Sequence, residues 1–162
     1  MGYSGAKWGT VVERNRPQML LGAYEHTIDD KNRLTLPAKF RESFEEGVVV
    51  TRGLDKCLLA YRGEDWLRYV ESRFAPLDPL SQETRRIQRF AFSGASEADL
   101  DKQGRVMIPA PLLKHAQLGR DVVIAGMRDH LEIWDRDAWH RELAEVEGSA
   151  EDVAERLATK SS

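Results

Sequence analysis

One segment of eleven residues occurs twice in this chain, and it constrains the fold more than any other feature. Residues 28–38 read Ile-Asp-Asp-Lys-Asn-Arg-Leu-Thr-Leu-Pro-Ala, and residues 100–110 read Leu-Asp-Lys-Gln-Gly-Arg-Val-Met-Ile-Pro-Ala. An aliphatic residue, an aspartate, a polar turn, an arginine and two aliphatic residues ahead of Pro-Ala recur in step, at an offset of 72 residues. Because an internal repeat defines the architectural unit, we expect two copies of one unit.

Each copy predicts the same order of elements. Residues 24–28 and 33–36 alternate around a turn, as is typical of a β-hairpin. Asn32 and Gly104 hold the same place in the two turns, and both residue types tolerate a positive φ. The first copy continues with elements expected at 37–44 (helix), 48–51 and 57–61 (strands) and 65–74 (helix). The second copy has them at 98–101 and 105–108 (hairpin), 109–116 (helix), 122–124 and 130–134 (strands) and from 137 (helix).

Neither copy is expected to be stable alone. A unit of about 45 residues buries too little apolar surface, and its hairpin exposes edges that invite pairing. We therefore expect the copies to interlock, so that strands of one complete the sheet of the other. The predicted division is a flexible extension (1–18), a first repeat (23–68), linking helices (69–95), a second repeat (96–139) and a C-terminal helix with an acidic tail (140–162).

The sequence also predicts how the second linking helix begins and how the C-terminal helix packs. Ser81 is positioned to cap a linking helix over 82–92. Trp139, Leu143 and Val146 are expected to form the buried face of the last helix, and the tail after Gly148 is expected to be short and loose.

The composition is that of a soluble globular protein, with 41% apolar and 31% charged residues and a net charge of −3. Residues 129–162 hold ten acids and four bases, a balance of −6, so residues 1–128 carry +3. No apolar run reaches the roughly 18 residues of a membrane span, and we expect no signal peptide ahead of the first repeat, because residues 1–18 lack a continuous apolar segment. Cys57 is the single cysteine; it is expected to be a buried strand residue in a reducing cytoplasm.

An aspartate and an arginine flank each turn, four residues apart. This spacing predicts a cross-strand ion pair that fixes the turn, with a contribution of about 0.2–1 kcal/mol. Alternatively, the aspartate orients the guanidinium toward an outside anion, because its planar fork meets phosphate or the O6/N7 edge of guanine with two hydrogen bonds. The residues expected to stabilise the turns are Asp29 and Asp101, and those expected to contact DNA are Lys31, Arg33, Lys102 and Arg105.

Taken together, the motifs resemble those of the MraZ family, bacterial transcriptional regulators of the AbrB-like superfamily. The resemblance covers about Met19 to Glu147. It rests on the doubled Asp-x-x-x-Arg turns and on four segments: Arg-Leu-Thr-Leu-Pro-Ala-Lys-Phe-Arg (33–41), Phe-Ala-Phe-Ser-Gly-Ala (90–95), Asp-Lys-Gln-Gly-Arg-Val-Met-Ile-Pro (101–109) and Leu-Glu-Ile-Trp (131–134).

This resemblance implies a mixed β/α fold, mainly β with short helices, in which tandem SpoVT-AbrB repeats form a swapped-hairpin barrel with pseudo-twofold symmetry inside one chain. It implies rings of several protomers that bind direct repeats in double-stranded DNA, upstream of the cell-wall and cell-division gene cluster and at the protein's own promoter. It also implies a cytoplasmic, nucleoid-associated location. The arginines that bind DNA in the family fall on Arg33 and Arg105, whereas Asn32 replaces the usual glycine and residues 1–18 have no counterpart.

Two other classes of function are possible from the residues. An enzyme would need Asp29 and Asp101 as an acid/base pair, but no nucleophile elbow, phosphate loop, dinucleotide fingerprint or metal spacing accompanies them. We expect no catalytic residue, metal, cofactor, small-molecule substrate or membrane partner. A protein-interaction module of the antitoxin type is the main alternative, although antitoxins normally carry one copy of the unit. Arg85, Arg86 and Arg89 are further candidates for DNA contact, with a solvated helix face as the competing interpretation.

Overall fold

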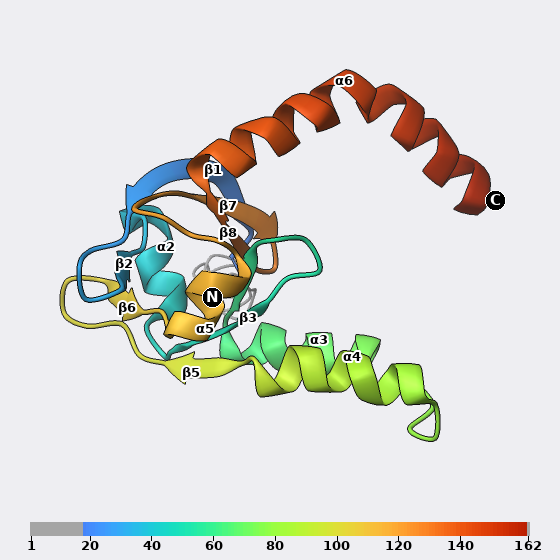
Figure 1. The fold of residues 1–162 in the computed structure, drawn as a ribbon, viewed down its shortest axis with the longest axis horizontal. Coiled ribbons are helices and arrows are strands. Elements are labelled where there is room, and N and C mark those ends of the chain that lie inside the picture. Colours follow the sequence, from blue (N-terminus) through green and yellow to red (C-terminus); the bar gives the residue numbers. More distant parts are fainter. Residues whose placement is uncertain (1–17, 162) are drawn as a thin grey trace, which may run out of the picture.

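The computed structural model describes residues 18–161 and shows a mixed α/β fold that consists mainly of strands (Figure 1). The strands gather at one end, and the α3–α4 pair and α6 extend away from them. In chain order the elements are β1 (Leu20–Thr27), β2 (Arg33–Thr35), α2 (Ala38–Arg41), the 3₁₀ helix η1 (Glu42–Phe44), β3 (Val48–Arg52), β4 (Leu58–Tyr61), α3 (Gly63–Arg73), α4 (Gln82–Ser93), β5 (Ser96–Ala98), β6 (Arg105–Met107), α5 (Ala110–His115), β7 (Asp121–Arg128), β8 (Leu131–Asp135) and α6 (Arg136–Ser161).

The strand order confirms that the two copies interlock. Six strands form one sheet in the order β1-β7-β8-β4-β3-β5, and β2 pairs with β6 in a separate two-stranded sheet. The strands β1, β3 and β4 of the first copy correspond to β5, β7 and β8 of the second. When each strand is replaced by its counterpart, the strand order of the sheet is the same, read from the opposite edge. Only the β3–β4 and β7–β8 pairs lie within one copy, whereas β1–β7, β3–β5, β4–β8 and β2–β6 join the copies.

The prediction that residues 24–36 and 98–108 each form a hairpin is wrong, because the strands before and after each turn pair with other strands and not with each other. β1 begins at Leu20 and pairs along its whole length with β7, while β5 ends at Ala98 and pairs with β3. Only the isolated bridge between Ile28 and Leu34 links the strands on either side of the first turn. The short strands after the turns pair with each other instead, because this pairing buries their central side chains, Leu34 and Val106, in the shared core.

The core contains residues of both copies on both sheets. Phe40 and Phe44 are fully buried on one side of the α2–η1 turn, which confirms the predicted apolar face of this short helix. Pro37 and Pro109 are the N-cap residues of α2 and α5, where the missing backbone N–H of proline costs no helical hydrogen bond. The largest fully buried side chains are Leu20, Leu34, Leu36, Phe40, Phe44, Val50, Leu58, Ile108, Leu112, Ile124, Leu131 and Ile133.

The linking helices α3 and α4 lie side by side outside the strands (Figure 1). The rings of Phe74 and Phe92 lie 4.8 Å apart between centroids and hold the pair together. The Ser81 side chain accepts a hydrogen bond from the Thr84 N–H, which confirms the predicted cap of α4. At the start of α3, Arg62 and Asp65 form a buried ion pair.

The C-terminal helix differs from its prediction. α6 runs from Arg136 to Ser161 without a break at Gly148, so the tail predicted to be loose is helical, and the Ser149 hydroxyl donates back to the Glu145 carbonyl oxygen. Leu143 and Val146, predicted to be buried, are 36% and 48% exposed. Of the extension predicted at 1–18, residues 1–17 lie outside the described part. None of the helices described is long and apolar enough to span a bilayer.

Candidate nucleic-acid interface

The first loop, residues 29–33, is organised by one aspartate side chain. The Oδ1 atom of Asp29 accepts hydrogen bonds from the backbone N–H groups of Lys31 and Arg33, both at 2.9 Å. The backbone closes the loop through Asp29 N–H to the Arg33 carbonyl and Asn32 N–H to the Asp29 carbonyl, both at 3.0 Å. Asn32 has a φ of +61°, as the sequence predicts.

The second loop, residues 101–105, repeats this geometry. The Oδ1 atom of Asp101 accepts from the N–H groups of Gln103 and Arg105, again at 2.9 Å. Gly104 takes the left-handed position with a φ of +75°. The predicted ion pairs are confirmed in both loops: Arg33 Nε lies 2.8 Å from Asp29 Oδ2, and Arg105 Nε lies 2.7 Å from Asp101 Oδ2.

The ion pairs orient the two guanidinium groups and leave part of each unused. Only Nε of Arg33 and of Arg105 engages the aspartate, and within residues 18–161 the terminal Nη atoms have no hydrogen-bond partner. Hydrogen bonds from the arginine backbone N–H and guanidinium lower the pKa of both Asp29 and Asp101, so both carboxyls stay ionised at neutral pH. Each arginine is therefore fixed at one edge and can donate from the other.

Pairing of β2 with β6 places the two arginines on one surface, which we call the β2–β6 ribbon. Arg33 is opposite Met107, and Arg105 is opposite Thr35. Because side chains alternate along a strand, these four residues share one face, and Leu34 and Val106 point to the core. Arg33 and Arg105 are diagonal neighbours, about 7–8 Å apart at their Cα atoms. Met107 is 61% exposed and the side chains of Arg33 and Arg105 are 29% and 27% exposed, so this face is partly open to solvent.

The two predicted lysines are exposed but not equivalent. Lys31 is the second residue after Asp29, whereas Lys102 is the first after Asp101. The first loop also holds Asp30, so its charges cancel, while the second loop carries +1. The structure therefore brings a cation to each loop, at different positions.

Arg41, which the sequence analysis did not select, contacts the second loop. A Cβ at Gly104 would lie 2.5 Å from both Cδ and Nε of Arg41. The Arg41 Nε donates to the Leu36 carbonyl at 3.0 Å, which holds the side chain there. Burial, together with the nearby Arg41 charge, lowers the pKa of His26. The residue that corresponds to Arg41 in the second copy is Leu113, so only a comparison of the copies position by position could have indicated this difference.

The arginines of α4 belong to a different part of the molecule. Figure 1 shows α4 beyond β5, on the side away from β2 and β6. Arg85, Arg86 and Arg89 are exposed, and Arg85 donates to the carbonyl oxygens of Pro79 and Leu80. The structure does not bring these three residues to the β2–β6 ribbon.

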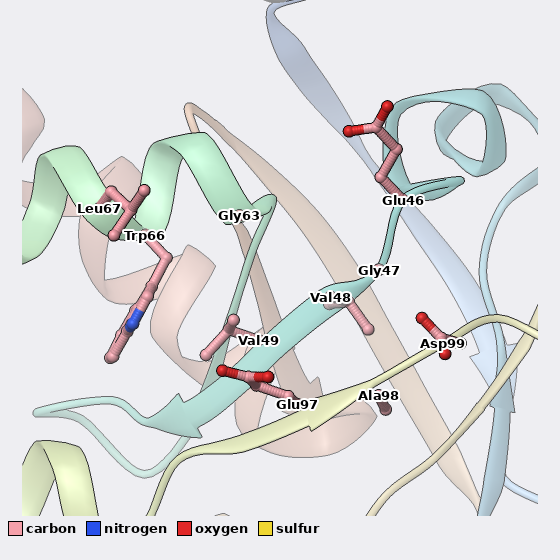
Figure 2. A pocket seen from close by; sticks show the side chains of 10 residues that line it. All are labelled: Glu46, Gly47, Val48, Val49, Gly63, Trp66, Leu67, Glu97, Ala98 and Asp99. Carbon is pink, nitrogen blue, oxygen red and sulfur yellow. The ribbon is translucent and has the colours of Figure 1, made fainter.

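A separate cavity of about 480 Å³ lies between β3, β5 and α3 (Figure 2). The carboxylates of Glu46, Glu97 and Asp99 surround it, which disfavours a phosphate. Its lining includes neither Asp29 nor Asp101, so it does not join the two aspartates into one site.

The other residues with potential chemistry do not assemble into a reactive centre in the described part. Cys57 is buried as predicted, and burial raises the pKa of its thiol to about 12, so it is protonated at neutral pH. Among residues 18–161, no three His, Cys, Asp or Glu side chains gather where they could hold a metal ion. The half-buried pair of arginines on the β2–β6 ribbon, with 29% and 27% of their side chains exposed, is the arrangement in this region with the clearest chemical use.

Comparison with known proteins gives consistent names. The family described as "MraZ protein, putative antitoxin-like" matches residues 19–90 and again residues 91–161. A protein of Roseiflexus sp. (strain RS-1) is 46% identical over 140 residues, which span 86% of this chain and 97% of the relative. One of Roseiflexus castenholzii is 48% identical over 143 residues, and one of Heliobacterium modesticaldum is 46% identical over 139 residues, with 97% and 96% of each relative covered. All three are named Transcriptional regulator MraZ.

Proposed function

This chain belongs to the MraZ family, and we propose that it is a transcriptional regulator that binds double-stranded DNA through the β2–β6 ribbon. One observation carries the proposal: Arg33 and Arg105 stand on the same partly exposed face, each held at Nε, and their terminal nitrogens have no hydrogen-bond partner in the described part of the chain. A two-stranded ribbon fits the major groove of B-DNA, where arginine can read guanine.

The residues of the interface have distinct proposed roles. Arg33 and Arg105 contact bases or phosphates, and Lys31 and Lys102 add charge at the two loops. Asp29 and Asp101 position the arginines and do not touch DNA. This function uses no catalytic residue and no cofactor. The antitoxin-type alternative, which the family description also mentions, has no better support, because both copies of the unit are present.

The assembly is proposed from the resemblance to the family, and a physical argument supports it. Two arginines and two lysines neutralise few phosphates, so one chain alone binds weakly. Several chains in a ring that meets direct repeats in DNA would gain through effective concentration. We further propose that the two sheets enclose the core as a swapped-hairpin barrel, that the protein acts at its own promoter and at the cell-division and cell-wall gene cluster, and that it is cytoplasmic and associated with the nucleoid.

The test is a fluorescence-anisotropy titration with DNA from upstream of the protein's own gene. Arg33→Ala/Arg105→Ala should weaken binding by on the order of 100-fold, because each guanidinium contact contributes about 1–3 kcal/mol. If the contacts are to phosphates, the slope of log K against log[salt] should also become shallower by about 1.8. Arg85→Ala/Arg86→Ala removes two exposed arginines from α4 and is the matched control, with binding close to that of the wild type.

Circular dichroism establishes whether the double variant is folded. A folded Arg33→Ala/Arg105→Ala variant that binds as tightly as the wild type would show that the ribbon is not the interface.

A further inference from the structure

Helix α6 carries an apolar seam, and the rest of the described chain leaves its middle part, from Leu143 to Val153, largely exposed. Apolar residues recur along α6 at alternating steps of four and three residues: Trp139, Leu143, Val146, Ala150, Val153 and Leu157. This is the a/d pattern of a coiled coil over three heptads. Leu143, Val146 and Val153 are 36%, 48% and 38% exposed. The pattern therefore describes a seam for a partner helix and not a face buried in the chain itself.

The contacts of α6 with the strands are made at its beginning. Asp135 accepts from the Ala138 N–H, the Trp139 ring lies 5.9 Å from that of Trp134, and His140 Nε2 lies 3.4 Å from Glu25 Oε1. Figure 1 shows the helix leaving the strands after this point. Most helices in proteins are stabilised by packing of an apolar face, and the seam from Leu143 to Val153 lacks such packing in the described part.

We propose that the α6 seam binds the α6 helix of a second copy of this chain, in antiparallel orientation. The a/d pattern is self-complementary, so two copies of one seam fit each other. Full overlap requires one register, in which Leu143 packs in a layer with Val153 of the second copy, and Val146 with Ala150 of the second copy. The outer layers join Trp139 to Leu157, which is 60% exposed.

The charges beside the seam select the antiparallel orientation. In this register Glu142 faces Arg156 of the second copy, and twofold symmetry gives this attraction twice. Glu147 faces Glu147 of the second copy, which gives a single repulsion. In a parallel pair Glu142 would instead face Glu147 of the second copy, and this repulsion would occur twice. Residues beside the seam set the orientation of coiled coils in this way.

The middle of α6 is bent, so pairing along the whole seam requires the two halves of the helix to straighten. Figure 1 shows the helix bending between its two halves. Gly148 and Ser149 lie at the midpoint of its residue range, and the Ser149 hydroxyl donates to the Glu145 carbonyl at 2.8 Å, a contact that bends helices. Gly148 falls opposite the seam in the heptad. The helices of a coiled coil curve only gently around each other, so the second copy would have to stabilise a straighter α6.

Sedimentation equilibrium of the full chain without DNA tests the seam. Val146→Glu places two carboxylates in the interface, and association should weaken by at least about 100-fold, because two buried valines are lost. The weight-average mass should fall twofold wherever the wild type is paired through α6, whether or not the proposed ring also forms. Ala144→Glu adds the same charge on the solvent-facing side of α6, away from the seam and from the positions that flank it, and should keep the wild-type mass.

Charge reversal tests the orientation. Glu142→Arg should weaken association in an antiparallel pair, because it faces Arg156, and Glu142→Arg/Arg156→Glu should restore it. In a parallel pair Glu142→Arg would strengthen association, and this result would overturn the proposal. A wild-type mass for Val146→Glu, or loss of mass with both Val146→Glu and Ala144→Glu, would overturn it as well. Since Arg33 and Arg105 are unchanged throughout, these results are separate from those of the DNA titration.

Discussion

Gly104 offers a test of why the two loops differ at their left-handed position. A Cβ at this residue would overlap Arg41, with 2.5 Å to both Cδ and Nε. In the first loop Asn32 holds the same place, and Leu113 stands where Arg41 stands in the other copy. We expect Gly104→Asn to push the Arg41 side chain away, and Asn32→Gly to leave its surroundings in place.

The magnitude follows from what Arg41 loses. Asparagine accepts a left-handed φ at little cost, so backbone strain contributes a minor part. Displacement breaks the 3.0 Å hydrogen bond from Arg41 Nε to the Leu36 carbonyl, and such a bond contributes about 0.5–1.5 kcal/mol. With some strain at the new Cβ, Gly104→Asn should lower the free energy of unfolding by about 1–2 kcal/mol. Asn32→Gly should change it by less than about 1 kcal/mol, mostly through the unfolded chain.

Urea denaturation of four proteins measures the effect: wild type, Gly104→Asn, Arg41→Ala and the double variant. Arg41→Ala removes the obstacle, so Gly104→Asn should cost about 1 kcal/mol less in that background. A loss of the same size with and without Arg41 would refute the reasoning, because the contact would then not explain why the second loop has glycine.

Two more predictions concern charged groups. Hydrogen bonds from arginine lower the pKa of Asp29 and Asp101 below the ordinary value near 3.9, so the stability that these carboxylates add is complete above about pH 4 and is lost as the pH falls through their lowered pKa. Urea midpoints measured from pH 5 to pH 2 should therefore fall less steeply for Asp29→Asn/Asp101→Asn than for the wild type, and equal slopes would contradict this. Asp65, whose side chain is 1% exposed, pairs with Arg62 in the interior; Asp65→Asn should lower the free energy of unfolding by about 3 kcal/mol in urea, because a buried cation loses its partner. A loss below about 1 kcal/mol would show that the Arg62 charge does not depend on Asp65 for its compensation.

The local chemistry of the site could be predicted from the sequence, because each loop is determined by residues within five positions of one another. Aspartate, arginine and a residue that tolerates positive φ are sufficient to specify the turn, and all three appear in both copies. The chain partner of β2 could not be predicted in the same way. Three residues that alternate in polarity fit a hairpin and an inter-copy pair equally well, and burial of Leu34 against Val106 decides between them.

The last helix shows a different limit. Its helical period is clear in the sequence, and the apolar residues at Leu143 and Val146 indicate a buried face. Periodicity indicates that a face needs a partner but not where the partner comes from. In the described chain the strands cover only the first turns of α6, so the seam stays exposed. The steps of four and three residues continue through Val153, and this regularity distinguishes a coiled-coil seam from a helix that packs on a sheet.

The position of the two arginines depends on both copies at once. In the β2–β6 ribbon Leu34 pairs with Val106, its own counterpart, so the local twofold axis passes between them. Two hydrogen bonds fix this register from either end: Leu36 N–H to the Gly104 carbonyl at 2.9 Å, and Ile108 N–H to the Asn32 carbonyl at 2.8 Å. A slip of one residue would turn one strand's arginine toward the core and its aliphatic residue toward solvent. The left-handed residues of the loops therefore contribute to the proposed interface twice, since they form the turns and their carbonyls also hold the register that brings Arg33 and Arg105 to one face.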